Sequence, residues 1–340
     1  MIVSLIKKAD YLYFSLHAEE VFTSNYEKDG TEGIKVSSLQ YETVQRIFEF
    51  VSSNDFSNYN YIIFDLKYIK HIQPNLLQKI IAIRDLGFKI VFTNVIKNLT
   101  APLSLDLIQN QFNIINSNEG YEKFYFFTSS SESIYNVELD AKKIFNNEFE
   151  HLIKNYITPY KQKHSSSFIY LSSFIDIKKF ISAESPFIYF ALYKLAMKIY
   201  FKWKKEIESN PILVCQSLTS TFIVSILAKF LDLDILVFDK VGPITKLYNK
   251  LEKHNFDKRK YIVVSDLVCL GTEVKITKSL IEFSGGRYLG NVSLIKIETL
   301  AREDLNPDNI DMTISIFSVT NENNKSLNYY IYTNLTPLNE

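Results

Sequence analysis

Three polar loops hold side chains whose types and positions could together form a site for chemistry. Each loop directly follows a short apolar run that predicts a buried strand. The predicted strands are Pro211–Cys215, Asp234–Phe238 and Tyr261–Val264, and the loops are Gln216–Ser220, Asp239–Pro243 and Ser265–Thr272. Hydroxyls, backbone amides, one lysine and two carboxylates stand on these loops. Such groups suit a phosphorylated ligand that also carries hydroxyls.

The loop Ser265–Thr272 is followed by an apolar-periodic helix that ends at Gly285-Gly286. A strand, a polar turn with Gly271 and a helix start form an anion site, because free N–H groups and the helix dipole favour negative charge there. The alternative is an ordinary strand-to-helix turn. In that alternative Asp239 and Asp266 are capping or loop carboxylates, and Lys240 is a solvated surface lysine.

The chemistry of the residues suggests a role for each part of the set. Lys240 and the amides of two turns suit a phosphate or pyrophosphate. Asp266 suits the hydroxyls of a ribose or a ligand position on Mg²⁺, which makes magnesium the candidate cofactor. The candidate residues are Gln216, Ser217, Thr219, Ser220, Asp239, Lys240, Ser265, Asp266, Cys269, Leu270, Gly271 and Thr272.

The second half of the chain repeats strand, loop and helix, which predicts an α/β fold with a doubly wound parallel sheet. Its further predicted elements are helices over Pro186–Glu208 and Thr221–Phe230 and strands over Val292–Glu298 and Met312–Phe317. In such sheets ligands bind outside the carboxyl ends of the strands. The three loops should therefore meet at one edge of the sheet.

The first half of the chain predicts a separate, compact α/β layer. Its predicted strands are Ile2–Ile6, Tyr11–Leu16, Tyr61–Leu66, Lys89–Thr93 and Phe112–Ile115, and its predicted helices are Ser38–Ser52 and Leu76–Arg84. A polar run, Ser129–Glu132, marks a boundary, and Ile134–Tyr160 has a helical pattern. We therefore expect an α/β domain over residues 1–128, a helical linker over 129–167 and a second α/β domain over 168–340.

Composition narrows the class of protein. The 340 residues carry no formal net charge, which argues against a general nucleic-acid binder. Cys215 and Cys269 form no disulfide or zinc motif, so a reducing cytoplasm is the simplest setting. The apolar window Phe187–Phe201 includes Lys194 and Lys198, so no membrane span is expected.

The residues Ile262–Val274 resemble the PRPP-binding motif of type I phosphoribosyltransferases, which has a hydrophobic strand, two acidic residues and a phosphate loop with threonine and glycine. The order of the surrounding elements over Phe168–Ile297 is similar to that of orotate phosphoribosyltransferases, including a hood region at Phe174–Phe180. The resemblance implies that Asp266 contacts ribose and that the amides of Cys269–Thr272 hold a 5′-phosphate. Lys240 and the Gln216–Ser220 loop would hold diphosphate and magnesium.

The sequence departs from that motif at several positions. Ser265 stands where the family has its first acidic residue, and Leu270 and Glu273 replace phosphate-binding residues. A carboxylate ~4 Å from a phosphate charge costs about 4 kcal/mol at an effective dielectric near 20. The loop Gln216–Ser220 also lacks glycine, so close backbone approach is harder. These departures predict a phosphoribosyltransferase fold with an eroded or repurposed site.

The stretch Tyr61–Phe127 resembles the STAS domain of anti-sigma-factor antagonists. In that family a serine or threonine at the head of the first helix is phosphorylated, but here Ile72-Gln73-Pro74-Asn75 has no hydroxyl. The resemblance therefore implies a docking or structural module that contacts a protein partner, and a homodimer is a further expectation.

Three functions remain open from the sequence. The preferred one is a regulator or sensor that binds a nucleotide or sugar phosphate. The second is an active transferase of altered specificity that releases pyrophosphate. The third is a scaffold without a ligand.

Overall fold

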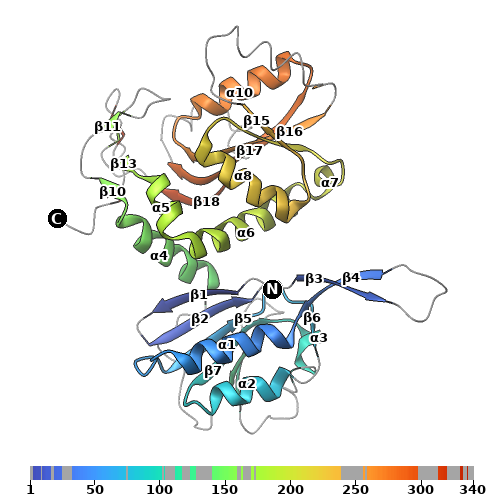
Figure 1. Ribbon diagram of the computed structural model, residues 1–340, viewed down its shortest axis with the longest axis vertical. Coiled ribbons are helices and arrows are strands. Elements are labelled where there is room, and N and C mark those ends of the chain that lie inside the picture. The colour runs from blue at the N-terminus through green and yellow to red at the C-terminus, as the bar shows by residue number, and fades with distance from the viewer. Residues whose placement is uncertain are drawn as a thin grey trace. The chain divides into compact units, whose positions relative to one another are not determined.

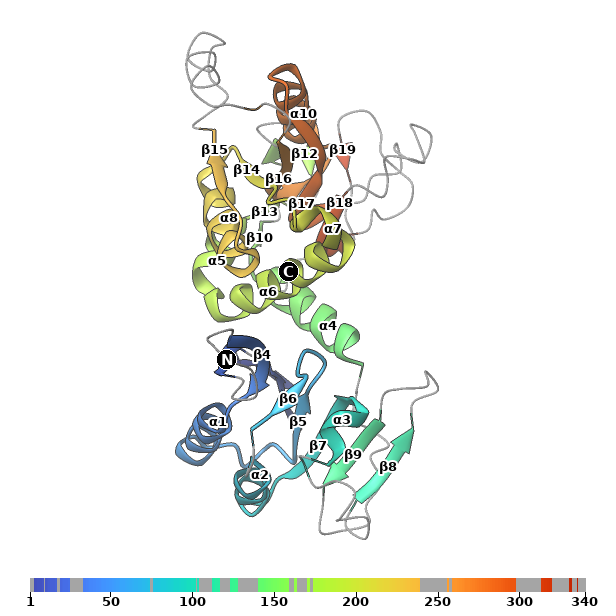
Figure 2. The same ribbon diagram turned by 90° about the vertical axis from the view of Figure 1, so that its right-hand side faces the viewer.

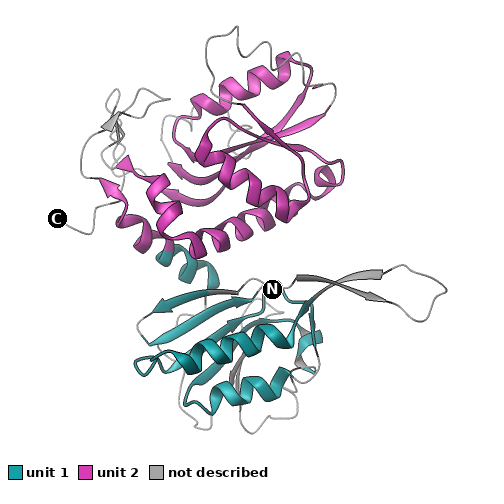
Figure 3. Cartoon of the chain, viewed as in Figure 1, with its two compact units in different colours: residues 1–148 teal, residues 149–340 magenta. Residues whose placement is uncertain are grey.

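The computed structural model describes residues 3–8, 10–16, 19–24, 33–73, 76–101, 103, 112–116, 123–127, 140–158, 162–163, 170–171, 174–238, 256, 259–297, 313–319, 330–331 and 335. The chain divides into two compact units, Met1–Glu148 and Phe149–Glu340 (Figure 3). The division falls inside helix α4 (Ala141–Lys154), which lies in the stretch predicted as a helical linker.

Unit 1 is built on a six-stranded mixed sheet with the order β1-β2-β5-β7-β9-β8. The strands are β1 (Val3–Lys8), β2 (Tyr11–Leu16), β5 (Tyr61–Asp65), β7 (Lys89–Val95), β8 (Phe112–Asn116) and β9 (Lys123–Phe127). Strands β2, β5 and β7 are parallel, and the remaining pairs are antiparallel. The two predicted strands at the start of the chain thus form a hairpin, and the predicted α/β layer is confirmed.

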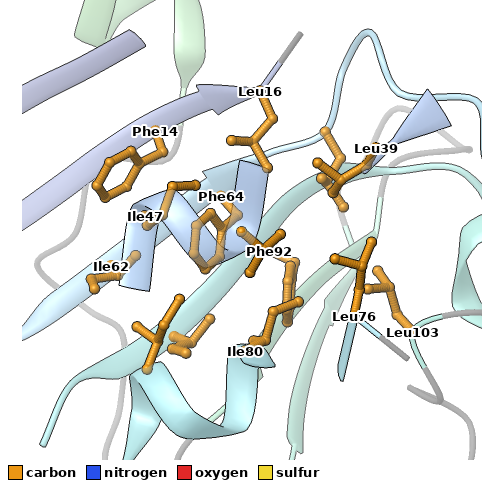
Figure 4. Packing of buried hydrophobic residues seen from close by; sticks show 14 of the residues in the cluster. Phe14, Leu16, Leu39, Ile47, Ile62, Phe64, Leu76, Ile80, Phe92 and Leu103 are labelled. Carbon is orange, nitrogen blue, oxygen red and sulfur yellow. The ribbon is translucent and has the colours of Figure 1, made fainter. Parts of the chain in front are cut away.

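One face of this sheet packs against helices α1 (Tyr41–Ser53) and α2 (Leu76–Arg84). Alternate strand residues such as Phe14, Phe64 and Phe92 enter this core together with Ile47 of α1 and Ile80 of α2 (Figure 4). The Phe14 and Phe64 ring centroids lie 5.8 Å apart, and those of Phe64 and Phe92 lie 5.9 Å apart. A row of aromatic rings in contact across three parallel strands therefore forms part of the core that packs against both helices.

The unit also contains a second sheet that the sequence did not predict. Strands β3 (Glu19–Ser24), β4 (Gly33–Leu39) and β6 (His71–Ile72) form this three-stranded sheet. A short helix, α3 (Lys97–Thr100), follows β7 and lies in the stretch Val95–Leu107, whose pattern predicts loop and helix.

A buried polar row closes the carboxyl edge of the parallel strands in unit 1. Ser15, Asp65 and Thr93 are in register and buried. Asp65 accepts hydrogen bonds from the Tyr13 hydroxyl, from Asn94 Nδ2 at 2.6 Å and from the backbone N–H of Lys67 at 3.0 Å. Burial and the neighbouring carboxylate raise the pKa of Tyr13, so its hydroxyl stays a donor. The carboxylate is thus occupied by the protein itself.

Unit 2 contains a five-stranded sheet in which every pair is parallel. Its order is β15-β14-β16-β17-β18. The strands are β14 (Ile212–Cys215), β15 (Ile235–Val237), β16 (Lys260–Val268), β17 (Arg287–Ile297) and β18 (Thr313–Val319). Numbered along the chain this is the order 2-1-3-4-5 of doubly wound folds. The parallel α/β sheet predicted for this half is confirmed.

Helices cover both faces of this sheet (Figure 1). Val214 and Val263 share a cluster with Val274 and Ile281 of α10 (Thr272–Phe283), which joins β16 to β17. On the other face, Cys215 Sγ lies 3.4 Å from Thr221 Oγ1 of α8 (Leu218–Leu231), which joins β14 to the neighbouring strand β15 (Figure 2). The chain thus moves in opposite directions from β14 and from β16. The gap between these two strands is the topological switch point.

Helix α6 (Ser185–Lys202) lies on the same side as α8 (Figure 1). The predicted continuous helix over Pro186–Glu208 is wrong, because the buried Trp203 has a non-helical backbone and separates α6 from α7 (Lys204–Ile207). Smaller elements complete the unit: α5 (Ile177–Ala183), β10 (Ile157–Thr158), β11 (Gln162–Lys163), β12 (Tyr170–Leu171), β13 (Phe174–Ile175) and β19 (Tyr330–Ile331). The predicted hood region corresponds to β13 and α5. Among the helices in the described ranges, none has the length and apolarity to cross a membrane.

Gly286 fixes how α10 returns to the sheet. A Cβ at this position would lie 2.7 Å from Tyr261 Cε2 and 2.9 Å from Ile281 Cγ2, both in the core. We expect Gly286→Ala to lower the free energy of unfolding by about 1–3 kcal/mol through overpacking. Denaturant unfolding measures the change. Ser284→Ala, in the same turn, is the control, and equal stability of the two variants would contradict the packing described.

Candidate functional site

The predicted extent of the third site loop is wrong, because β16 is longer than the sequence indicated. Ser265 and Asp266 are strand residues, and the pairs Ser265↔Ser293 and Val268↔Lys296 continue the ladder with β17. Leu267 and Val268 are buried. The long partner strand β17 holds these residues extended, so the loop shrinks to residues 269–271.

The end of β16 projects beyond β14 towards the carboxyl edge. The ladder between these strands ends at Val214↔Val263, and β14 itself ends at Cys215. Continuing this register places Gln216 and Ser217 level with Ser265 and Asp266. The structure therefore brings two of the three predicted loops together at the switch point.

Asp266 is half-buried at the projecting end of β16. Its Oδ1 accepts a hydrogen bond at 2.7 Å from the backbone N–H of Leu267. This contact holds the carboxylate against its own strand. Ser265 beside it is buried and brings a hydroxyl in place of a second carboxylate.

The loop after β14 is closed by an N-cap. Ser217 Oγ accepts a hydrogen bond at 3.0 Å from the backbone N–H of Ser220 and lies 2.8 Å from Ser220 Oγ. This cap starts α8 at Leu218 rather than at the predicted Thr221. Thr219 and Ser220 are buried in the helix, so Gln216 and Ser217 supply the half-buried polar side chains of this loop. Gln216 Nε2 is buried and has no hydrogen-bond partner among the residues that the structure describes.

The loop after β16 ends in an open helix N-terminus. Gly271, the N-cap of α10, has a φ of 68°, the left-handed conformation that glycine favours, and gives no side-chain cap. The first-turn N–H groups of Thr272, Glu273 and Val274 have no intrahelical acceptor. These groups can bind an anion, although the Glu273 carboxylate stands in the same turn. Cys269 is buried, and Leu270 is half-buried beside it.

Lys296 is a cation at this edge that the sequence analysis missed. It is half-buried on β17, in register with Val268, and therefore projects to the same face as Asp266. Within the described ranges it makes no ion pair or hydrogen bond. A single lysine near the end of the apolar run Val292–Ile297 was the available signal.

The predicted loop Asp239–Pro243, with the candidate residues Asp239 and Lys240, falls outside the described residues. The chain reaches the same edge just before Asp239, since the Phe238 N–H donates to the carbonyl of Cys215 at 2.9 Å. Cys215 and Cys269 are both buried and are not joined in a disulfide within the described part of the chain. Burial raises the pKa of the Cys215 thiol.

The described part of the chain holds no cluster of three or more His, Cys, Asp or Glu residues that could ligate a metal. As a single carboxylate, Asp266 could supply one ligand to Mg²⁺. The ion would then keep several waters and take its other ligands from a bound phosphate.

No protein-family model matches the sequence, and no curated protein matches it either. Solved structures similar to it include UMP synthase from Leishmania donovani, at 11% identity and a TM-score of 0.40 over 50% of this chain and 36% of that one. Orotate phosphoribosyltransferase from Mycobacterium tuberculosis aligns at 13% identity and a TM-score of 0.37 over 51% and 95% of the two chains. Adenine phosphoribosyltransferase from Rhodothermus marinus aligns at 15% identity and 0.36 over 51% and 99%. The fold assignment given above rests on the strand order and register.

Removal of the Ser217 cap should destabilise unit 2 without altering the sheet. We expect Ser217→Ala to lower the free energy of unfolding by about 1 kcal/mol, whereas Ser217→Thr keeps a hydroxyl acceptor for the Ser220 N–H and stays near wild type. Chemical denaturation compares the variants. Equal losses for alanine and threonine would show that Ser217 acts through another contact.

Proposed function

We propose that the carboxyl edge of the parallel sheet in unit 2 binds a nucleotide or a phosphorylated sugar related to PRPP, in a regulatory or sensing role and with weakened transferase chemistry. One observation carries the proposal. At the switch point of a doubly wound sheet, Asp266 stands beside an uncapped helix N-terminus and the loop after β14. The resemblance of Ile262–Val274 to the PRPP motif points to the same place.

Each part of the ligand has a matching group in this proposal. The amides that open α10 receive the 5′-phosphate. Asp266 accepts hydrogen bonds from ribose hydroxyls, and a carboxylate acceptor makes these stronger than neutral ones. A bound phosphate together with Asp266 provides the oxygen ligands that Mg²⁺ needs, and the ion would neutralise phosphate charge.

The residues around this site argue for weak catalysis. Displacement of pyrophosphate from C1 of the ribose needs stabilisation of charge on the sugar and on the leaving group. Ser265 supplies no charge for this purpose, and Glu273 adds a negative charge to the turn that would hold phosphate. The alternative, an active transferase of altered specificity, predicts release of pyrophosphate from PRPP at substrate-dependent rates.

Unit 1 is proposed as the contact surface for a protein partner. Its resemblance to STAS domains and its mixed α/β sheet support this role. Its carboxyl-edge carboxylate, Asp65, is buried and satisfied by three donors within the unit, so unit 1 offers no comparable ligand group there. Homodimer formation and a cytoplasmic location belong to the same proposal.

Asp266→Asn should weaken binding of ribose 5-phosphate by about 10- to 100-fold, the loss of hydrogen bonds to a charged acceptor. Asparagine keeps an oxygen for the Leu267 N–H, so the end of β16 stays in place. Isothermal titration gives the affinity. Asp234→Asn removes an exposed carboxylate at the opposite edge of the sheet and is the control. Equal affinities for Asp266→Asn and wild type would place the ribose elsewhere.

Lys296 supplies positive charge at the same edge, so Lys296→Ala should reduce affinity for ribose 5-phosphate about 10-fold. The matched variant is Lys260→Ala, since Lys260 is also half-buried but begins β16 at the amino edge. Titration at two salt concentrations should show a weaker salt dependence in Lys296→Ala alone. Identical behaviour of the two alanine variants would remove Lys296 from the site.

A further inference from the structure

The two sides of the switch point differ in what they can bind. Anion-binding groups gather on the β16 side, where α10 opens without a cap and Lys296 lies one strand further along. On the β14 side, the described residues Gln216, Ser217 and Leu218 carry no charge. Among the described residues, a ligand that spans both sides therefore meets anion-binding groups at one end and uncharged groups at the other.

Helix α8 begins on the β14 side, and a side-chain cap already occupies one of its N-terminal amides. Ser217 Oγ holds the third amide of α8, that of Ser220, at 3.0 Å. No glycine stands between Gln216 and Ser220, so the backbone cannot approach a phosphate closely without displacing side chains. A diphosphate placed here would also face the carboxylate of Asp266, which is level with Ser217 in the continued register.

The same loop offers contacts that suit an uncharged ring. Leu218, the first residue of α8, has 86% of its surface exposed at the edge of the sheet. Leu270 is half-buried in the loop on the other side of the switch point. Gln216 Nε2 is a buried donor without a partner, which requires an acceptor atom. An aromatic ring with carbonyl or ring-nitrogen acceptors would satisfy both the apolar and the donor groups.

We infer that this site prefers a nucleoside monophosphate, with its base on the β14 loop, over a sugar carrying a 1-diphosphate. The inference rests on the proposed function, because it assumes that the phosphate and ribose lie at α10 and Asp266. It adds the chemical class of the third part of the ligand, beyond the phosphate and the ribose. The β14 loop receives a neutral heterocycle, and the ligand brings a single phosphate group.

Titration of the full chain with AMP, UMP, ribose 5-phosphate and PRPP with Mg²⁺ tests the inference. At least one nucleoside monophosphate should bind 10-fold or more tightly than both ribose 5-phosphate and PRPP. Millimolar pyrophosphate with Mg²⁺ should leave that nucleotide bound. Leu218→Ala should weaken nucleotide binding about 5-fold and leave the affinity for ribose 5-phosphate unchanged. The matched control is Leu86→Ala, which trims a leucine of unit 1 that is 44% exposed.

The outcomes separate this inference from the function on which it rests. If ribose 5-phosphate binds but PRPP binds more tightly than either nucleotide, or if pyrophosphate displaces the nucleotide, the inference is wrong and the proposed function stands. If Leu218→Ala weakens ribose 5-phosphate and nucleotide equally, Leu218 acts on the fold and the base does not lie on this loop. If none of the four ligands binds, both the inference and the proposed function are wrong.

Discussion

Unequal pairing of one strand determines the candidate site. Strand β16 pairs with β17 from Lys260 to Val268, but its pairing with β14 stops at Val263. Because the last residues of β16 are held on one side alone, they project beside the loop that follows β14. The polar residues Ser265 and Asp266 occupy this projecting end. Helices α8 and α10 leave this gap in opposite directions, which makes it the topological switch point of the sheet.

The two units differ in how the polar residues at the carboxyl edge of their sheets are hydrogen-bonded. In each, polar residues stand at the carboxyl ends of parallel strands. In unit 1, Asp65 is buried and bonded to Tyr13, Asn94 and the backbone of residue 67, which rigidifies the sheet. In unit 2, Gln216 Nε2 has no partner and the first amides of α10 have no side-chain cap. The second edge therefore retains hydrogen-bonding capacity for a ligand.

Charge is the basis on which we propose ligand binding without efficient transferase chemistry. A transferase site must stabilise a diphosphate leaving group, whereas a binding site needs only to hold the ligand's resting charge. Ser265 in place of an acidic residue and Glu273 in the first turn of α10 both reduce the capacity to manage diphosphate and magnesium. The Ser217 cap on α8 occupies the Ser220 amide, so this amide cannot bind diphosphate. These local features are the reason for which we propose binding without efficient transfer.

The sequence predicted the parts of this fold that local patterns specify. Apolar runs such as residues 261–264 marked the buried strands, and Gly271 marked the turn before α10. The polar end of β16 was not predicted, because its strand conformation depends on pairing with β17, which follows only after helix α10. Strands β3 and β4 were missed since runs such as Glu19–Ser24 lack an apolar run or a strict alternation. The break at Trp203 and the position of Lys296 likewise depend on tertiary packing and register.

The central claim is that the carboxyl edge between β14 and β16 holds a phosphorylated sugar. A crystal structure of the full chain with ribose 5-phosphate tests it most directly. The account predicts the phosphate at the amides of residues 272–274 and the ribose hydroxyls within hydrogen-bond distance of Asp266. A ligand bound at any other surface, with this edge empty, would contradict the account.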